Sequence, residues 1–168
     1  QVVNPIPPHR AAGSAPGSWL ANAGLNNSSS NGVPDGRWCV VDVLSYESTA
    51  VAGVHVIGDA SSCGLPKAGH VANQEAKICA DAIIRIAGGQ APDSGPVANS
   101  ACYSPITAST ASWLTAVYQY DASTRRMAIA SNGGVTSGAR ATEAASITNG
   151  NFRQMNTWFN TLMGDTFS

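Results

Sequence analysis

The chain has 168 residues, a length that suits one domain or one domain with a piece of another. Hydrophobic residues make up 43% of it, enough for a core, and charged residues only 11%, against about 25% in typical soluble proteins. The net charge of −1 gives no reason to expect nucleic acid or an anionic membrane as a partner. No apolar run approaches the roughly 20 residues of a membrane-spanning helix.

The first part of the chain carries few signals for regular structure. Segment 17–25 (GSWLANAGL) predicts a short helical turn whose large side chains pack inward: Trp19, Leu20 and Leu25. Residues 26–36 are rich in Ser, Asn and Gly and predict a loop. Residues 38–43 are typical of a strand, because a Pro-Asp-Gly turn signal precedes their apolar run.

The chain is organised around segment 54–85. The apolar residues at 54–57 predict a short buried strand that ends in Gly58-Asp59 and leads through a Gly/Pro/Ser-rich loop into a helix. In α/β proteins this arrangement holds a phosphate- or sugar-bearing cofactor. Glycine permits close approach, the carboxylate accepts hydrogen bonds from hydroxyls, and the helix start offers unpaired N–H groups. An ordinary turn with an N-cap region is an equal alternative for Gly58-Asp59.

The strongest helix signal covers residues 69–87. Apolar side chains recur there at steps of three and four, which predicts one buried face: Val71, Ala72, Ile78, Cys79, Ala82, Ile83 and Ile86. Lys77, Asp81 and Arg85 lie four apart on the opposite face and are expected to pair along it. Gly88-Gly89 predicts the end of the helix.

The remainder of the chain has the pattern of β-structure followed by a helix. After a linker at 90–100, strands are expected at 101–107, 113–120 and 126–130, with a hairpin turn at 121–123 and an Asn-Gly-Gly turn at 132–134. A final helix is expected over 151–165, with one apolar face: Phe152, Met155, Phe159, Leu162 and Met163. We therefore expect an α+β fold in which a small C-terminal antiparallel sheet is capped by a helix.

The four cysteines are Cys39, Cys63, Cys79 and Cys102, and no two of them have CxxC spacing. The three histidines do not cluster with them in the sequence, so no metal site is expected. Cys79 falls on the apolar face of the predicted helix and is expected to be a buried small hydrophobe.

Six separated stretches, in this order and spacing, resemble one family. They are NPIPPHRA near the start, WCVVD at 38–42, VHVIGDA at 54–60, LPKAGHVANQEAK at 65–77, ACYSPI at 101–106 and the closing GDTFS. Together they look like the C-terminal part of the flavoprotein subunit of flavocytochrome c sulfide dehydrogenase, a disulfide-reductase-like FAD family near sulfide:quinone reductase. The resemblance covers essentially the whole chain.

The resemblance implies two domains. Residues 1–90 would be the returning, incomplete half of an FAD-binding α/β domain, and residues 91–168 the C-terminal interface domain. The GxGxxG fingerprint that holds the ADP half of FAD in this family does not occur in the sequence. We therefore expect a fragment of a longer enzyme, without the first half of the FAD fold and without the middle, NAD-like domain.

The resemblance also implies roles for six cofactor-binding residues. Asp59 matches the aspartate that hydrogen-bonds the ribityl and phosphate region of FAD, and Gly58 permits the close approach. Four residues match the segment that passes the pyrimidine edge of the isoalloxazine, where the next helix points its N-terminus at N1/O2: Pro66, Lys67, Ala68 and Gly69. A solvated loop lysine is an equal alternative for Lys67.

Cys102 is the catalytic candidate. ACYSPI matches the segment that supplies one half of a redox-active cysteine pair beside the flavin, where sulfide attacks the disulfide and forms a persulfide. The partner cysteine would lie upstream, so Cys102 is expected to be unpaired, with a buried structural cysteine as the alternative. Cys39 and Cys63 are not assigned to catalysis. His70 departs from the aromatic or serine-type residue expected in the family, and its contact, with flavin or with solvent, stays open.

As a whole, the resemblance implies an FAD-dependent enzyme that oxidises sulfide and passes electrons to a c-type cytochrome subunit in the periplasm. The isolated chain is expected to be inactive, because FAD would lose most of its contacts, and to self-associate through apolar surface. Two alternatives stay open. One is a non-catalytic oligomerisation or cytochrome-docking module, and the other is a related flavin oxidoreductase that acts on NAD(P)H or a quinone.

Overall fold

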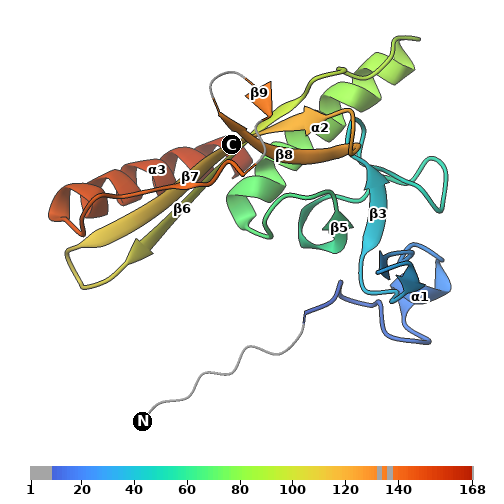
Figure 1. Ribbon diagram of the computed structural model, residues 1–168, viewed down its shortest axis with the longest axis horizontal. Helices are drawn as coiled ribbons and strands as arrows, with labels where there is room; N and C mark the ends of the chain where they lie inside the picture. The colour runs from blue at the N-terminus through green and yellow to red at the C-terminus, as the bar shows by residue number, and fades with distance from the viewer. Residues whose placement is uncertain (1–8, 132–133, 136–137, 168) are drawn as a thin grey trace.

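The computed structural model describes residues 9–131, 134–135 and 138–167. Much of the NPIPPHRA stretch, part of the expected turn at 132–134 and the last residue of GDTFS lie outside these residues. Figure 1 shows short N-terminal elements on one side of the molecule and a long hairpin with a helix along it on the other.

The N-terminal half is built from short elements. They are α1 (Trp19–Asn22), β1 (Ser29–Ser30), β2 (Val33–Pro34), β3 (Cys39–Asp42), β4 (Glu47–Ser48), the 3₁₀-helix η1 (Gly58–Ala60) and β5 (Ser61–Ser62). Strand β3 pairs antiparallel with β4 and parallel with β5, while β1 and β2 form a separate ribbon. The strand expected at 38–43 is therefore confirmed as β3.

The strand expected over residues 54–57 is wrong. His55 makes an isolated bridge to Glu47, and Ile57 is exposed. The backbone N–H of Val56 donates to Tyr46 O at 2.9 Å, so this segment bonds to the β4 region at separate points rather than along a ladder. An apolar run becomes a strand only where another strand runs alongside it, and that neighbour is decided by tertiary structure.

Helix α2 (Gly69–Ala87) has the predicted bounds and ends at Gly88-Gly89, with Gly89 at a φ of +73°. Its buried residues are Val71, Glu75, Cys79 and Ala82, so Cys79 is buried as expected. Ile83 and Ile86 are exposed, because this end of α2 extends beyond the sheet (Figure 1). Arg85 pairs with Asp81 at 2.6 Å, as expected.

The C-terminal half is one antiparallel sheet covered by a helix. Its elements are β6 (Val97–Pro105), β7 (Ala111–Asp121), β8 (Arg126–Ser131), β9 (Gly134–Val135), β10 (Thr142–Glu143) and α3 (Asn149–Phe167). Strand β7 is central and pairs with β6, β8 and β10. The β7–β8 hairpin forms where it was predicted, whereas β6 begins inside the expected linker. The α+β fold is confirmed.

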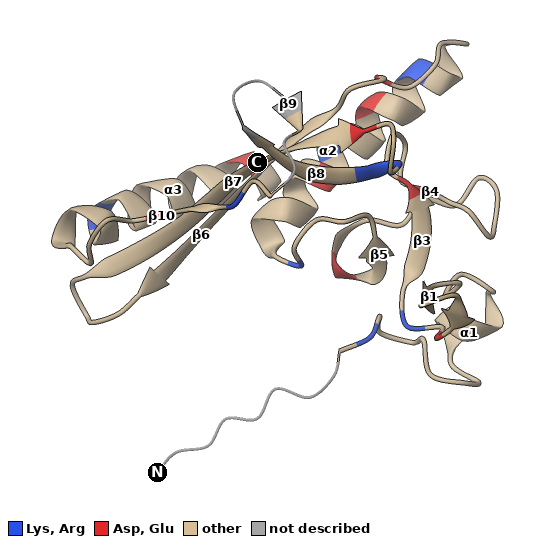
Figure 2. Cartoon of the chain, viewed as in Figure 1, with Lys and Arg blue, Asp and Glu red and all other residues tan. Residues whose placement is uncertain are grey.

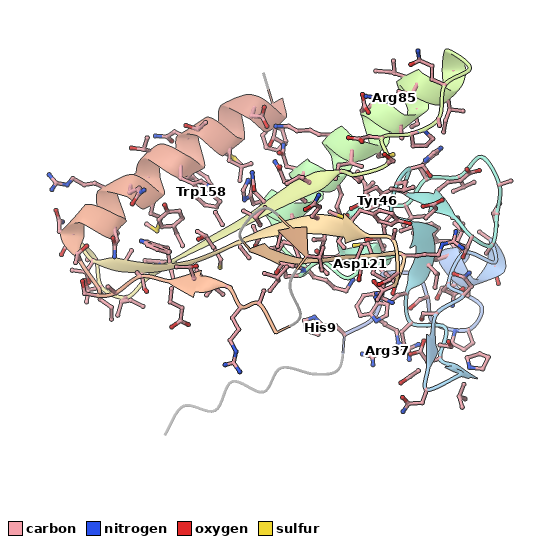
Figure 3. All side chains as sticks on the ribbon, turned by 45° about the horizontal axis from the view of Figure 1, so that its top comes forward. His9, Arg37, Tyr46, Arg85, Asp121 and Trp158 are labelled. Carbon is pink, nitrogen blue, oxygen red and sulfur yellow. The ribbon has the colours of Figure 1, made fainter. Side chains whose placement is uncertain are left out.

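Helix α3 lies along the β6–β7 hairpin (Figure 1). Its inward aromatic residue is Trp158, which packs on Tyr103 of β6 with ring centroids 5.2 Å apart. Figure 3 shows Trp158 between the helix and the hairpin. Phe159, predicted to face inward, is 51% exposed. The prediction is wrong for Phe159, whereas the other four residues of the predicted face are part-buried: Phe152, Met155, Leu162 and Met163.

Two apolar clusters form the core. The larger joins β3, α2, β6 and β8 around Tyr46, which is fully buried. The smaller contains Leu20 and Leu25, as predicted, but Trp19 is 67% exposed. Figure 2 shows charged residues scattered singly over the ribbon, in keeping with the low charge content. None of the described helices is both long enough and apolar enough to cross a membrane.

Candidate functional site

The Gly58-Asp59 turn lies against the start of α2. Gly58 has a φ of +70°, a backbone conformation that favours glycine, and a Cβ atom there would lie 3.5 Å from the Cβ of Ala72. Asp59 follows it in η1 and is exposed. No hydrogen bond to the Asp59 carboxylate is present within the described part of the chain. The turn thus presents a free carboxylate beside a helix N-terminus.

A buried carboxylate, which the sequence reasoning missed, holds this turn by hydrogen bonds. Glu75 of α2 is only 2% exposed. It accepts hydrogen bonds from the backbone N–H of Gly58, from Cys63 Sγ at 3.1 Å and from Ser61 Oγ at 3.4 Å. Burial raises the pKa of Glu75, and these hydrogen bonds oppose that shift. The available signal was its position four residues after Val71 and four before Cys79, on the apolar stripe.

Lys67 closes the loop between the turn and the helix. Its Nζ donates to the backbone carbonyls of Asp59 and Ser61, both at 2.7 Å. The ammonium group also lies 4.0 Å from the ring centroid of Trp38, a cation–π contact. Lys67 therefore orders the loop while its side chain stays exposed, so the alternative of a solvated loop lysine is left open.

The N-terminus of α2 is open. Ala68 occupies the N-cap position and makes no side-chain cap, and the first turn contains no acidic residue. Pro66 and Gly69, which flank the cap, are exposed. Uncapped first-turn N–H groups and the partial positive charge of the helix end favour a bound anion over a cation. The six sequence-predicted cofactor residues are therefore neighbours here.

Cys102 stands apart from the other three cysteines. All four are free thiols, but Cys102 is exposed on β6, whereas Cys39, Cys63 and Cys79 are buried. Burial raises the pKa of each of these three thiols, which makes them poor nucleophiles. The alternative of a buried structural cysteine is therefore wrong for Cys102.

His70 connects Cys102 to the helix N-terminus. The backbone N–H of Ala101, next to Cys102, donates to Nδ1 of His70 at 3.0 Å. The His70 ring also meets Trp158 edge-on, with centroids 5.7 Å apart. The structure thus brings the start of α2 and the Cys102 segment together, which the sequence reasoning, undecided about His70, did not predict.

These groups fit a cofactor that carries hydroxyls and negative charge. The free Asp59 carboxylate suits hydroxyl donors, and the uncapped start of α2 at Gly69 suits an anionic edge. The exposed Cys102 thiol, on the strand held to this helix, is the reactive group of the set. The described residues therefore offer an exposed carboxylate, a helix end that favours anions and an exposed thiol.

The C-terminal part of the chain is similar to one family of flavin-binding proteins. Residues 94–167, which contain β6 through α3, match the family model described as flavocytochrome c sulphide dehydrogenase, flavin-binding. This match over residues 94–167 supports the resemblance to a C-terminal part of that flavoprotein. The matched segment includes Cys102. It begins after Gly58 and α2, so the description of those residues rests on the geometry above.

Proposed function

We propose that the chain is the flavin-facing C-terminal part of a sulfide dehydrogenase, with residues 1–90 as the returning half of an FAD-binding domain and 91–168 as the interface domain. The observation that carries the proposal is the position of Cys102. It is the exposed cysteine of the chain, and it lies on a strand that hydrogen-bonds to the first turn of α2 through His70. Cysteine and cofactor segment are thereby held in one unit.

In this proposal six residues face the cofactor. Asp59 accepts hydrogen bonds from ribityl hydroxyls, and Gly58 lets the backbone approach. Four residues form the approach to the isoalloxazine edge: Pro66, Lys67, Ala68 and Gly69. The start of α2 stabilises negative charge at that edge through its dipole of roughly half a charge. Lys67 acts indirectly, because its ammonium group is already bonded to two loop carbonyls.

Cys102 supplies the redox chemistry. A hydrosulfide ion attacks a disulfide between Cys102 and a cysteine outside this chain. One S–S bond forms, the original S–S bond breaks, and the released cysteine leaves as a thiolate. That thiolate and the deprotonated persulfide can then join in a new S–S bond, which releases two electrons, and FAD, when bound, would supply the acceptor for them. The free and exposed state of Cys102 supports this role, since it needs a partner from elsewhere.

A c-type cytochrome is the proposed acceptor of the electrons, and the periplasm, where disulfides persist, is the proposed compartment. A docking role, the second candidate, is favoured by exposed isoleucines at the projecting end of α2, where Ile84 is 72% exposed and Ile83 and Ile86 are 44% and 47% exposed. Apolar side chains gathered on one helix end are typical of surfaces that bind another protein.

Flavin titration of the purified chain tests the cofactor part of the proposal. We expect weak, saturable quenching of FAD fluorescence, with the colour lost on desalting, because one chain supplies only part of the contacts. Asp59→Asn should weaken the binding, whereas Asp93→Asn, at an exposed loop position, should not. Equal quenching by all three proteins would remove Asp59 from the site.

Sulfide reduction tests the catalytic part. In the flavin-loaded parent protein, Cys102→Ser should abolish bleaching of the flavin by sulfide. Cys79→Ala, at a buried thiol, should leave the bleaching in place. Bleaching that survives in the Cys102→Ser protein would overturn the catalytic role. Binding of the flavin-free chain to a c-type cytochrome without any sulfide-dependent bleaching would favour the docking module.

A further inference from the structure

His70 occupies the meeting point of three elements. It is the second residue of α2, it accepts a hydrogen bond from Ala101 in β6 at 3.0 Å, and it contacts Trp158 of α3. Trp158 in turn packs on Tyr103, two residues beyond Ala101. Both chain neighbours of Cys102 are therefore held: Ala101 by the imidazole of His70, and Tyr103 by the ring of Trp158.

The hydrogen bond at Ala101 satisfies a group on an open strand edge. Among the described strands, β6 pairs with β7 alone, so its other edge presents backbone groups that no strand satisfies. His70 Nδ1 takes the N–H of Ala101 on that edge. The residue that follows is Cys102, opposite Leu114 in the register with β7. A shift of the backbone at Ala101 would therefore also move the thiol of Cys102.

The hydrogen bond also defines the protonation state of the ring. Nδ1 can accept from an N–H only when it carries no proton, so the imidazole is neutral with its proton on Nε2. A proton on Nδ1 would turn two donors toward each other. Among the described contacts of β6, the hydrogen bond from Ala101 to His70 is therefore the one that protonation removes directly.

The charged groups around His70 come from both helices. α2 contributes Lys77, and α3 contributes Asp165, which pairs with Lys77 at 2.7 Å. β6 contributes the Tyr103 phenol, whose ring packs on Trp158. A cavity of about 240 Å³ lies beside the ring, between the two helices. Burial lowers the pKa of His70, the Lys77 cation lowers it further, and the Asp165 carboxylate opposes the shift.

We propose that His70 is a positioning residue: its neutral imidazole fixes β6 at Ala101 and so sets the place of Cys102 relative to the start of α2, and acid releases this tether. The consequence for catalysis rests on the function proposed for Cys102. The tether itself is a property of the chain and is tested without flavin or sulfide.

Hydrogen exchange at the Ala101 amide tests the tether in the full chain. His70→Asn keeps an acceptor near the place of Nδ1 but does not titrate, whereas His70→Phe keeps a ring against Trp158 and removes the acceptor. After correction for intrinsic exchange, we expect His70→Phe to lower protection of Ala101 at pH 7.5 by roughly fivefold to tenfold, the value of one hydrogen bond. The unsubstituted chain should lose protection as the pH falls below 6.5, the ordinary pKa of imidazole, which burial and Lys77 lower at His70, and His70→Asn should not.

A nitroxide on Cys102, the exposed thiol, reports the consequence for its position. Its spectrum should show greater mobility in His70→Phe at pH 7.5, and in the unsubstituted chain at the acid pH where protection of Ala101 is lost. His70→Asn should remain ordered at both values. Unchanged protection of Ala101 in His70→Phe, or an equal acid response in His70→Asn, would overturn the proposal. The function proposed for Cys102 fails separately, if Cys102→Ser leaves sulfide bleaching intact in the parent protein while the tether behaves as stated.

Discussion

Replacing Glu75 by leucine removes the buried carboxylate under the Gly58-Asp59 turn. The Gly58 N–H would then have no acceptor, and the thiol of Cys63 would lose its acceptor 3.1 Å away. Ser61 Oγ would keep its bond to the Gly58 carbonyl at 2.9 Å. The main cost is therefore one unsatisfied, part-buried backbone donor, which is about 2 kcal/mol. For a domain of this size that lowers Tm by roughly 4–8 °C.

Glu75→Gln is the matched control, because its amide oxygen can still accept from Gly58. Burial raises the pKa of Glu75 above the ordinary value of 4.5, so the unfolded chain releases this proton at a lower pH than the folded chain does. The stabilising contribution of the protonated form is complete below pH 4.5 and is lost as the pH rises through the folded pKa. Urea unfolding of all three proteins between pH 4 and 8 measures both effects.

We expect the unfolding free energy of the original chain to fall with rising pH in this window more steeply than that of Glu75→Gln. At pH 7, Glu75→Gln should be at least as stable as the original chain, and Glu75→Leu should be the least stable of the three. A Glu75→Leu protein as stable as the original would refute the claim that the carboxylate satisfies Gly58. Identical pH slopes for the original chain and Glu75→Gln would refute the raised pKa.

Two further predictions concern packing and the loop. Trp158→Ala should cost about 2 kcal/mol in urea unfolding, because a half-buried indole leaves its contacts with His70 and Tyr103. Phe159→Ala, at a side chain 51% exposed, should stay within about 0.5 kcal/mol of the original. The reversed order would contradict the packing of Trp158, rather than Phe159, against the hairpin. Lys67→Met should cost about 1–2 kcal/mol, because two carbonyls lose a charged donor and Trp38 loses its cation. Lys77→Met, which loses a solvent-exposed ion pair with Asp165, should cost less. Equal unfolding midpoints in urea for the two variants would contradict the role given to Lys67.

Local chemistry in the sequence determined the helix and hairpin bounds. The periodic apolar residues over 69–87 and the glycine pair after them predicted α2 at both ends, since 3.6-residue periodicity and a left-handed glycine are properties of the segment itself. The turn at 121–123 predicted the β7–β8 hairpin for the same reason. The motifs also selected Cys102 from four cysteines, and its exposure agrees with that choice.

Tertiary structure alone decided what covers each face. The apolar residues at 54–57 found no strand to pair with, and α3 turned Trp158 rather than Phe159 toward the sheet. Glu75 lies on an apolar stripe because three donors from a distant turn meet it there, and His70 accepts from a strand 31 residues away. Periodicity tells which residues share a face of an element. The neighbour that a face meets depends on contacts between segments far apart in the chain, which no local pattern records.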